Sequence, residues 1–481
     1  YPSPLYDGCY DVSDFRDIDP RFGSLADAAA LIDAAHEHGI RVIVDLVPNH
    51  TSSEHHWFQE ALAAGPGSPE RDRYIFRPGK GPDGAEPPTN WEAVFGGSAW
   101  ERVEDGEWYL HLFDPTQPDL NWENEEVRAE FDDIFRFWIE RGVDGFRIDV
   151  AHGMVKDLSL PDVETSGRIL ESARTFGHPH WDRDGVHEIN RRWRTVLDES
   201  GRDVMMVAEA WVHPDRLPLY LRSDEYHQSF NFDLLETPWD ASLYQRTITT
   251  AYEAASSVGS TSTWTLSNHD VMRHATRFGL PPGTQWRRWP LDGPHDVLDE
   301  TLGLRRARAA TLVLMALPGS IYLYQGEELG IPEVWDLPVD VLDDPTWENS
   351  GRTQKGRDGC RVPVPWTSTG PSYGFGDAEP WLPMPPVYGE LSVEAQTGRE
   401  GSTLELYRSA LALRKAHLTD DEDLEWIDLG DGLLAFERGS GIRCLSNFGA
   451  PAIPLPDGDV LIASGPVDGT LPADTTVWIA T

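Results

Sequence analysis

The strongest constraint on the fold is a repeated pattern in which a helix-like segment precedes a short apolar run. Residues 24–38 begin with a Ser24 cap, have alanine-rich helical spacing and end before Gly39, and the apolar run 41–47 follows. The same order recurs along the chain, in 125–141 with 145–150, 182–199 with 204–208, and 301–317 with 320–324; 261–266 is a further strand-like run. Runs such as 41–47 are typical of parallel strands buried on both faces. The pattern therefore predicts an α/β protein, most economically a (β/α) barrel.

Two regions interrupt this pattern. Residues 51–119 are rich in Pro, Gly and Trp and far exceed the usual strand-to-helix loop, which predicts a small inserted domain. From about residue 421 the apolar residues alternate, in 432–438, 442–446 and 476–480, which predicts an antiparallel β domain. We therefore expect a barrel in two parts, 1–50 and 120–420, an inserted domain at 51–119, and a C-terminal β domain at 421–481.

Composition excludes several classes of protein. The chain of 481 residues carries 40 Lys+Arg against 81 Asp+Glu, a formal charge of −41, which disfavours binding to nucleic acid or to an anionic membrane surface. No apolar stretch approaches the ~20 residues of a spanning helix, and no signal peptide is visible at the first residues. Three cysteines are a sparse, odd number that favours a reducing compartment. We expect a cytoplasmic protein; its oligomeric state is not predicted.

Ionisable residues follow several of the predicted strands. Each of them alone would usually be structural, because an Asp at a strand end commonly caps the next loop. The set comprises Asp45 with His50, Arg147 with Asp149, Glu209, and His269 with Asp270. In a (β/α) barrel the C-terminal strand ends converge on one active site. Retaining glycoside hydrolysis needs two carboxyl groups ~5–5.5 Å apart, and neighbouring strands lie ~4.8 Å apart, so Asp149 and Glu209 suit that chemistry.

The same residues resemble the signature regions of the α-amylase family, glycoside hydrolase family 13. Four blocks carry the resemblance: Asp45-Leu46-Val47-Pro48-Asn49-His50, Gly145-Phe146-Arg147-Ile148-Asp149, Val207-Ala208-Glu209-Ala210 and Ser267-Asn268-His269-Asp270. A fifth block, Gln117-Pro118-Asp119-Leu120-Asn121, is similar to that of the oligo-1,6-glucosidase/α-glucosidase branch. The resemblance extends over essentially the whole chain. It implies a (β/α)8 TIM barrel with a domain inserted after the third strand.

The resemblance also implies roles for particular residues. Asp149 would be the nucleophile, Glu209 the acid and base, and Asp270 the group that stabilises the transition state. Substrate-binding residues would be Asp7, Tyr10, His50, Arg147, His269 and Arg361. Arg147, two residues before Asp149 on the same strand face, should keep that carboxylate ionised, whereas apolar walls such as Trp211 and nearby negative charge should raise the pKa of Glu209.

The chain departs from the family pattern at Cys9 and at its start, and Val150 bears on linkage preference. Cys9 stands where relatives usually have Gly, and a buried, inert cysteine is expected there. Val150 is the residue type that relatives favouring α-1,6 bonds tend to have, although a β-branched residue ending a strand explains it nearly as well. Only six barrel strands are expected, so the first two, with the early loop that binds calcium in some relatives, would precede residue 1. No metal or cofactor is therefore expected within this chain.

The favoured interpretation is a retaining, exo-acting α-glucosidase that releases glucose from short α-1,4- or α-1,6-linked oligosaccharides. One alternative is a glucosyl-transferring or isomerising relative, of the sucrose isomerase or trehalose synthase type, which would share the same residues and exclude water better. Another is a non-catalytic family member, such as a transporter heavy chain. The presence of all three carboxylates and the lack of an apolar span argue against that class.

Overall fold

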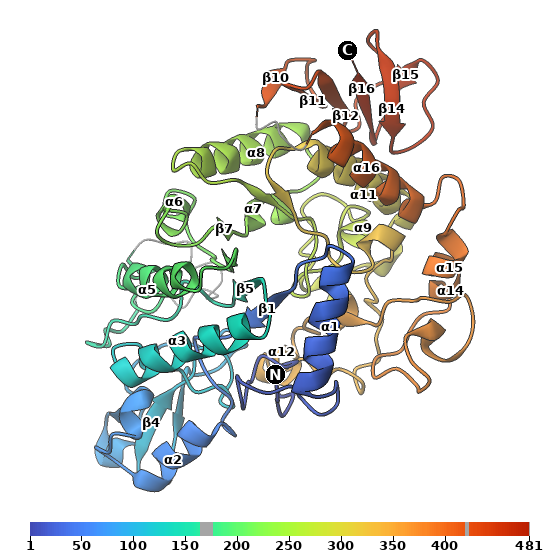
Figure 1. The fold of residues 1–481 in the computed structure, drawn as a ribbon. Helices are drawn as coiled ribbons and strands as arrows, with labels where there is room; N and C mark the ends of the chain where they lie inside the picture. Colours follow the sequence, from blue (N-terminus) through green and yellow to red (C-terminus); the bar gives the residue numbers. More distant parts are fainter. Residues whose placement is uncertain (164–176, 419–422, 481) are drawn as a thin grey trace. The chain divides into compact units, whose positions relative to one another are not determined.

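The structure, a computed structural model, describes residues 1–163, 177–418 and 423–480. The chain folds into two compact units (Figure 1). The first unit comprises Tyr1–Phe230 with 254–260 and 348–350, and the second comprises Asn231–Glu253, Thr261–Trp347 and Gly351–Thr481. The domain ranges expected from the sequence stay a prediction.

The first unit is built on a parallel sheet that confirms the predicted helix-then-strand pattern. Its strands lie in the order β1 (Ile43–Leu46), β5 (Gly145–Ile148), β6 (Met205–Ala208) and β7 (Gln228–Ser229). The prediction that 41–47 is buried on both faces is wrong for Ile43, which is 39% exposed. The reason is that β1 is an edge strand of this sheet.

Helices of this unit follow the sequence signals at their ends. Their bounds are α1 (Leu25–Glu37), α3 (Glu125–Glu140), α5 (Val186–Glu199) and α6 (Leu217–Tyr220). The predicted Ser24 cap forms a capping box with Asp27, in which each side chain bonds the other's backbone N–H. Phe135 of α3 packs edge-on against Phe146 of β5, with ring centroids 4.6 Å apart, and against Trp193 of α5 at 5.2 Å. These aromatic contacts fix the two helices to one face of the sheet.

The segment after β1 contains a small antiparallel sheet. It consists of helix α2 (His56–Ala64), two short 3₁₀ turns (Arg71–Arg73 and Pro82–Gly84) and strands β2 (Phe76–Pro78), β3 (Trp100–Arg102) and β4 (Glu107–Leu110), in the order β2-β4-β3. Phe58 of α2 contacts Tyr74 and Tyr109 edge-on at 5.1 and 5.0 Å. The many aromatics of this segment therefore form a local core.

The second unit contains a pair of parallel strands and a set of helices. The strands are β8 (Thr263–Trp264) and β9 (Ser320–Ile321); together with β1, β5, β6 and β7 they are the six parallel strands in the part of the chain that the structure describes. The longer helices are α8 (Ala241–Ser256), α11 (Glu300–Ala316) and α16 (Thr403–His417); the last residues of α8, and of the short helix α12 (Thr346–Asn349), belong to the first unit. The shorter helices are α7 (Phe232–Glu236), α9 (His274–Arg277), α10 (Trp289–Asp292), α12 (Thr346–Asn349), α13 (Asp358–Arg361), α14 (Tyr388–Leu391) and α15 (Val393–Gln396), with 3₁₀ turns at His295–Val297, Glu327–Leu329 and Pro371–Gly374.

The predicted alternation near the C-terminus forms a five-stranded antiparallel sheet that packs against α11. The sheet has the order β10 (Glu425–Ile427), β11 (Leu433–Arg438), β12 (Ile442–Asn447), β16 (Thr475–Ala480) and β14 (Asp459–Ala463); β13 (Ile453–Pro454) pairs with β15 (Thr470–Leu471). The indole of Trp478 donates to the Leu312 carbonyl at 2.9 Å, and buried Arg438 donates to the Ala316 carbonyl at 2.7 Å. Arg438 thereby satisfies a carbonyl at the end of α11.

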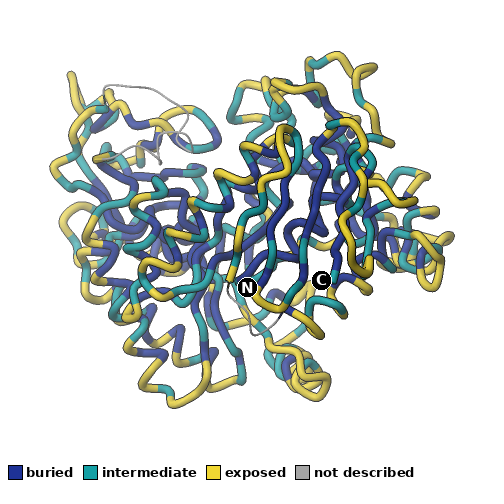
Figure 2. The backbone as a smooth tube through the Cα atoms, turned by 90° about the horizontal axis from the view of Figure 1, so that it is seen from above, coloured by how far each residue is buried: buried dark blue, intermediate teal, exposed yellow. Residues whose placement is uncertain are grey.

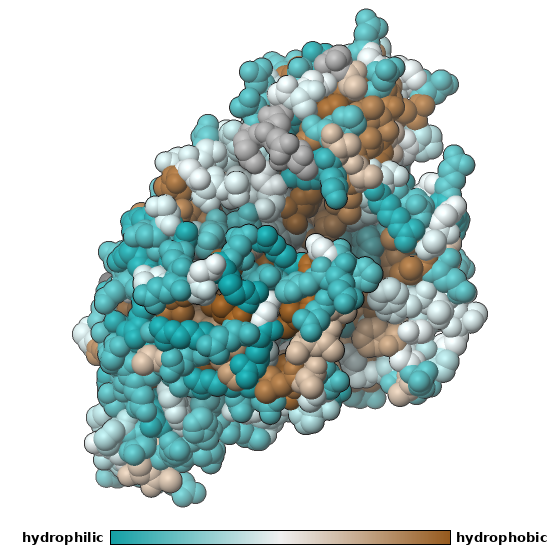
Figure 3. All heavy atoms as spheres, in the orientation of Figure 1, coloured by the Kyte–Doolittle hydropathy of each residue, from teal (hydrophilic) through white to brown (hydrophobic). Residues whose placement is uncertain are grey.

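Burial and surface polarity agree with the composition. Long buried stretches, dark blue in Figure 2, run through both units, and the exposed stretches are mainly loops and outer helix turns. The face shown in Figure 3 is mostly hydrophilic, as the large excess of Asp and Glu leads one to expect. Among the described helices, none is long and apolar enough to span a bilayer.

Candidate active site

Strand register brings Asp149 and Glu209 together in the first unit. Arg147 of β5 pairs with Val207 of β6, and Ile148 pairs with Ala208, so the next residues along, Asp149 and Glu209, leave the two strands side by side. The Glu209 N–H donates to the Ile148 carbonyl at 2.9 Å, which continues the parallel pattern past the strand end. Both side chains are buried, with 6% exposure each. The predicted pairing of these carboxyl groups is thus a direct result of the sheet.

Arg147 contacts every carboxylate of this cluster. One guanidinium nitrogen lies 3.0 Å from both oxygens of Asp45 and also donates to Asp149, and the other lies 3.0 Å from Oε2 of Glu209. The Tyr10 hydroxyl donates to Asp45 at 2.9 Å and packs beside the guanidinium. Arg147 therefore holds the carboxyl groups in fixed positions and neutralises part of their charge.

The protonation of the pair depends on burial as well as on Arg147. Burial is the largest influence on the pKa of Asp149 and raises it well above its usual range; Arg147 lowers it, and the neighbouring Glu209 raises it. Two adjacent buried carboxylates repel each other, so the charge of Glu209 acts on Asp149 in the same direction as burial. The expectation that Arg147 would keep Asp149 ionised is therefore wrong for this structure, because burial outweighs the effect of the arginine.

The backbone turns sharply just after Asp149. Val150 has φ of 47°, in the left-handed region that β-branched residues rarely adopt. This turn directs the Val150 N–H to Oε2 of Glu209 at 3.1 Å, and the Trp211 indole donates to Oε1 at 3.1 Å. Glu209 is therefore held by Val150 and Arg147 at Oε2 and by Trp211 at Oε1, so the expected contact with Trp211 is present as a hydrogen bond.

The segment before α1 contributes Asp7 and Tyr10. Asp7 is 3% exposed and accepts a hydrogen bond from the Gln117 amide at 3.1 Å, while its carbonyl accepts from the Tyr10 N–H at 2.8 Å. Cys9, between them, has φ of 78°. It is only partly buried and forms no disulfide, so the expectation of a buried cysteine at this position is wrong. The left-handed conformation explains why Gly suits this position.

This conformation makes a prediction for stability. Replacing Cys9 with Gly should increase the free energy of unfolding by about 1 kcal/mol, because it removes the steric cost of a side chain in the left-handed region. Urea unfolding measures the change. Cys9→Ala, which removes the sulfur and keeps Cβ, is the matched control and should give no such gain. An equal gain in both variants would show that the thiol, rather than the backbone, is responsible.

A chain of hydrogen bonds sets the protonation of His50. The side chains of Lys156 and Asp119 are fully buried and form an ion pair of 2.8 Å, and Lys156 also donates to Oδ1 of Asn49 at 2.8 Å. Lysine has only donors, so the Asn49 amide nitrogen must face Nδ1 of His50, at 3.2 Å. Burial lowers the pKa of His50 to about 4, so the ring is neutral near pH 7. Its Nε2 lies 3.1 Å from the Tyr10 carbonyl and 3.2 Å from the Gln117 amide nitrogen.

His269, Asp270 and Arg361 form a second cluster, in the second unit. Arg361 donates from Nε to the His269 carbonyl at 2.9 Å and from its terminal nitrogen to Asp270 at 3.3 Å. Arg357 lies 3.2 Å from the same Asp270 oxygen and also pairs with buried Asp344. His269 lies 3.4 Å from the other oxygen of Asp270. Two arginines from one segment thus orient Asp270.

Several residues of these clusters are not predicted as site residues from the sequence. Asp45 is recognised there only as a strand-end residue, although it is the principal partner of Tyr10 and Arg147. Two sequence features could have marked Lys156 and Arg357 as site residues. Only four lysines occur in this arginine-rich chain, and Arg357 precedes Arg361 by one helical turn. Among the described residues, no group of three or more His, Cys, Asp or Glu is arranged to hold a metal ion.

Comparison with known proteins identifies the family. The family model described as "Alpha amylase, catalytic domain" matches residues 1–421, and the chain belongs to this family of glycoside hydrolases. It therefore has the family's (β/α) barrel class of fold with a C-terminal antiparallel β domain, as predicted.

Individual relatives share most of the chain. It is 36% identical over 451 residues to the oligo-1,6-glucosidase of Parageobacillus thermoglucosidasius, covering 87% of this chain and 75% of the relative. It is 35% identical over 472 residues to a probable α-glucosidase of Rhizobium meliloti (strain 1021), covering 93% and 80%.

Solved structures with other named activities are similar as well. The α-glucosyl transfer enzyme XgtA matches with a TM-score of 0.85 and 31% identity, covering 100% of this chain and 90% of that chain. The trehalulose synthase MutB of Pseudomonas mesoacidophila MX-45 matches with a TM-score of 0.84 and 26% identity, covering 100% and 90%.

Proposed function

We propose that this protein is a retaining, exo-acting α-glucosidase that hydrolyses terminal non-reducing α-1,4- or α-1,6-glucosidic bonds of short oligosaccharides. The observation that supports it most is the pair of buried carboxyl groups that leave neighbouring strands side by side, Asp149 and Glu209, both in contact with Arg147. Neighbouring strands lie ~4.8 Å apart, which suits the ~5–5.5 Å of the retaining mechanism better than the ~6.5–9.5 Å that an inverting enzyme needs to admit water. The named activities of the sequence relatives support the same substrate class.

In the proposed mechanism an oxygen of Asp149 attacks the anomeric carbon while the bond to the leaving oxygen breaks. Glu209 gives its proton to that oxygen, so the aglycone leaves as a neutral alcohol. In the second step Glu209 takes a proton from water, the water oxygen displaces Asp149, and glucose leaves with retained configuration. The hydrogen bonds from Val150 and Trp211 aim the Glu209 carboxyl group, and Arg147 stabilises Asp149 as a carboxylate when substrate excludes water.

The remaining residues are proposed to bind the sugar. Asp7, Tyr10 and His50 are held rigidly in the first unit, and His269, Asp270 and Arg361 in the second, with Asp270 stabilising the oxocarbenium-like transition state. The mechanism needs no metal or cofactor in this proposal. The sparse cysteines, none of them in a disulfide, are consistent with a reducing, cytoplasmic location.

A panel of disaccharides tests the proposal. Incubation with maltose, isomaltose, sucrose and trehalose tests for hydrolysis. NMR of the glucose first released from sucrose or trehalose, whose leaving groups supply no β-glucose, should show the α-anomer before mutarotation. β-Glucose as the first anomer from these two sugars would contradict the retaining mechanism, and inertness toward all four sugars would contradict the α-glucosidase activity. Glu209→Gln should hydrolyse these sugars poorly yet retain activity on aryl glucosides whose leaving groups need no proton.

Val150 makes a further prediction about linkage. We expect cleavage of isomaltose alongside maltose, and Val150→Thr should shift the ratio of kcat/KM values toward maltose by about 1–2 kcal/mol, the scale of one pocket contact. Both residues are β-branched, so the strained turn is the same in the two proteins. An unchanged ratio would show that this position does not set linkage preference.

A transferring or isomerising enzyme is the second candidate. The structural similarity to an α-glucosyl transfer enzyme and to a trehalulose synthase favours it. These activities share the first chemical step and differ in whether a sugar or water attacks the glucosyl-enzyme. Sucrose converted to an isomeric disaccharide, with little free glucose, would support this candidate over hydrolysis.

A further inference from the structure

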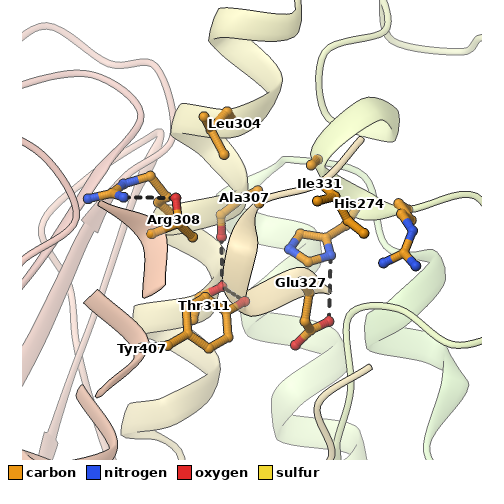
Figure 4. Close-up of a pocket in the computed structure, with 12 residues that line it drawn as sticks. His274, Leu304, Ala307, Arg308, Thr311, Glu327, Ile331 and Tyr407 are labelled. Carbon is orange, nitrogen blue, oxygen red and sulfur yellow. Dashed lines mark hydrogen bonds and ion pairs between the residues drawn. The ribbon is translucent and has the colours of Figure 1, made fainter. Parts of the chain in front are cut away.

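A small buried pocket in the second unit lies directly behind the segment that carries Asp270. Its lining comes from four parts of the chain: the residues after Asp270, the Glu327–Leu329 turn, α11 and α16. Figure 4 shows His274 and Glu327 pointing toward one another across it, with Thr311 and Tyr407 beside them. Neither His274 nor Glu327 has a part in the proposed mechanism, although both are almost fully buried.

Ser267 and His274 close the loop that contains His269 and Asp270. The Ser267 hydroxyl oxygen accepts from the His274 N–H at 3.1 Å and hydrogen bonds to Nδ1 of the His274 ring at 2.7 Å. The Ser267 carbonyl accepts from the Thr265 hydroxyl at 2.9 Å, and inside the loop the Asp270 N–H donates to Asn268. The two hydrogen bonds between Ser267 and His274 join the ends of the loop. The position of the His274 ring therefore fixes the backbone of the loop that contains Asp270.

The Glu327 carboxyl group lies near the same ring nitrogen of His274. Its Oε2 lies 3.8 Å from Nδ1 of His274, is fully buried and has no hydrogen-bond partner among the described residues. Tyr407 lines the same pocket. The Tyr407 hydroxyl lies 2.8 Å from that of Thr311, which donates to the Ala307 carbonyl of α11. Because the Thr311 proton is used on Ala307, Tyr407 donates its own proton to Thr311.

The cations near Glu327 are engaged elsewhere. Arg273 donates to the carbonyls of Gln325 and Cys360, and Arg308 donates to the Ser464 carbonyl and to the Thr403 hydroxyl. Burial lowers the pKa of His274 to about 3, so the ring is neutral. The adjacent Glu328 adds negative charge to the same turn. An ionised Glu327 would therefore be a buried carboxylate without a cation in direct contact, which is costly.

We propose that Glu327 and His274 are positioning residues for Asp270: a protonated Glu327 supports the His274 ring, and His274 fixes the loop through Ser267. Burial raises the pKa of Glu327 to about 8, although Arg273 and Tyr407 oppose the shift. Above that pH the carboxylate would repel the lone pair on the facing imidazole and disturb the loop. The effect on catalysis rests on the proposed role of Asp270, whereas the protonation of Glu327 does not.

Thermal unfolding tests the protonation without any assay of activity. A carboxyl group whose pKa is raised in the folded state stabilises the protein at low pH, and this stability is lost as pH rises from the unfolded value of about 4.3 to about 8. Glu327→Gln cannot ionise, so its Tm should equal that of the wild type near pH 5 and exceed it by several degrees at pH 8. Glu328→Gln is the matched control: it removes a carboxylate from the same turn but should keep the fall in Tm between pH 5 and pH 8, because Glu327 can still ionise. A Glu327→Gln curve parallel to the wild type would overturn the proposal.

Kinetics with 4-nitrophenyl α-glucoside test the positioning, because this leaving group depends little on proton donation by Glu209. The wild-type kcat should fall above pH 8, and Glu327→Gln should keep its kcat to a pH at least about one unit higher. His274→Leu should lower kcat by about 10- to 100-fold with little change in KM. His274→Asn, which keeps a polar atom where Nδ1 lies, should recover most of that loss.

Each result decides one part of the proposal. A folded His274→Leu protein with wild-type kcat would contradict the positioning role. Failure of the wild type to hydrolyse any α-glucoside would refute the proposed function, and the Tm series would still decide whether Glu327 is protonated.

Discussion

Replacement of Asp149 by Ala should reduce the kcat for α-glucosides by about 10⁴-fold or more, because no other group can form the covalent intermediate. The loss should be equal for sugars and for aryl glucosides, since even a good leaving group needs a nucleophile. Circular dichroism and Tm should stay close to those of the wild type, because Arg147 retains Asp45 and Glu209 as partners. Near-wild-type turnover would show that Asp149 is not the nucleophile.

Azide provides a sharper control for this variant. In the space left by the carboxylate, azide can attack the anomeric carbon directly from the face that Asp149 occupied. The product should be β-glucosyl azide, of inverted configuration, formed only with Asp149→Ala and an activated substrate. Asp45→Ala, which removes another carboxylate contacting Arg147, is the matched comparison and should give no glucosyl azide.

Replacement of Lys156 by Met should destabilise the protein by about 3–5 kcal/mol, the largest effect on stability that we expect. The variant leaves the Asp119 carboxylate buried without its cation and frees the Asn49 amide to turn, so His50 loses its fixed proton position. Urea unfolding measures the first effect, and an increase in KM for disaccharides measures the second.

Two further variants separate the causes. The double variant Lys156→Met with Asp119→Asn removes both charges and should recover most of the lost stability while leaving KM raised. Lys80→Met removes an exposed lysine whose pair with Asp162 is long, 3.4 Å, and should cost less than about 1 kcal/mol. A Lys156→Met protein as stable as Lys80→Met would mean that the buried pair contributes little.

The fold is predictable where local signals and long-range packing agree. Ser24 with Asp27 marks the start of α1 to the residue, and the alternation in 432–438 and 442–446 locates β11 and β12. β7 is not predicted, because a strand of two residues, Gln228–Ser229, has no recognisable period. Strand lengths are overestimated at 261–266 and 320–324, where the paired strands comprise only Thr263–Trp264 and Ser320–Ile321, because apolar composition does not show where ladder pairing ends.

The sequence predicts which residues form the site better than it predicts their protonation. Spacing and family resemblance place Asp149 and Glu209 on neighbouring strands, and the register brings them together. The burial that raises the pKa of Asp149 depends on the packing of residues far apart in the sequence. The residues next to Asp149 in the sequence therefore do not predict it. The left-handed turn at Val150 is not predicted either, because a β-branched residue after a strand favours extended backbone.

The ion pair of Asp119 with Lys156 bears on how this protein could be re-engineered. Asp119 ends the irregular segment that starts at Thr51, whereas Lys156 lies in the loop that follows β5 and contains Asp149. The buried ion pair therefore joins the 51–119 segment to the loop of the proposed nucleophile. A graft that exchanges residues 51–119 for the equivalent segment of a relative therefore replaces Asp119 and leaves Lys156 in place. Donor segments are interchangeable only if they supply a carboxylate for Lys156; any other donor requires a compensating change at 156.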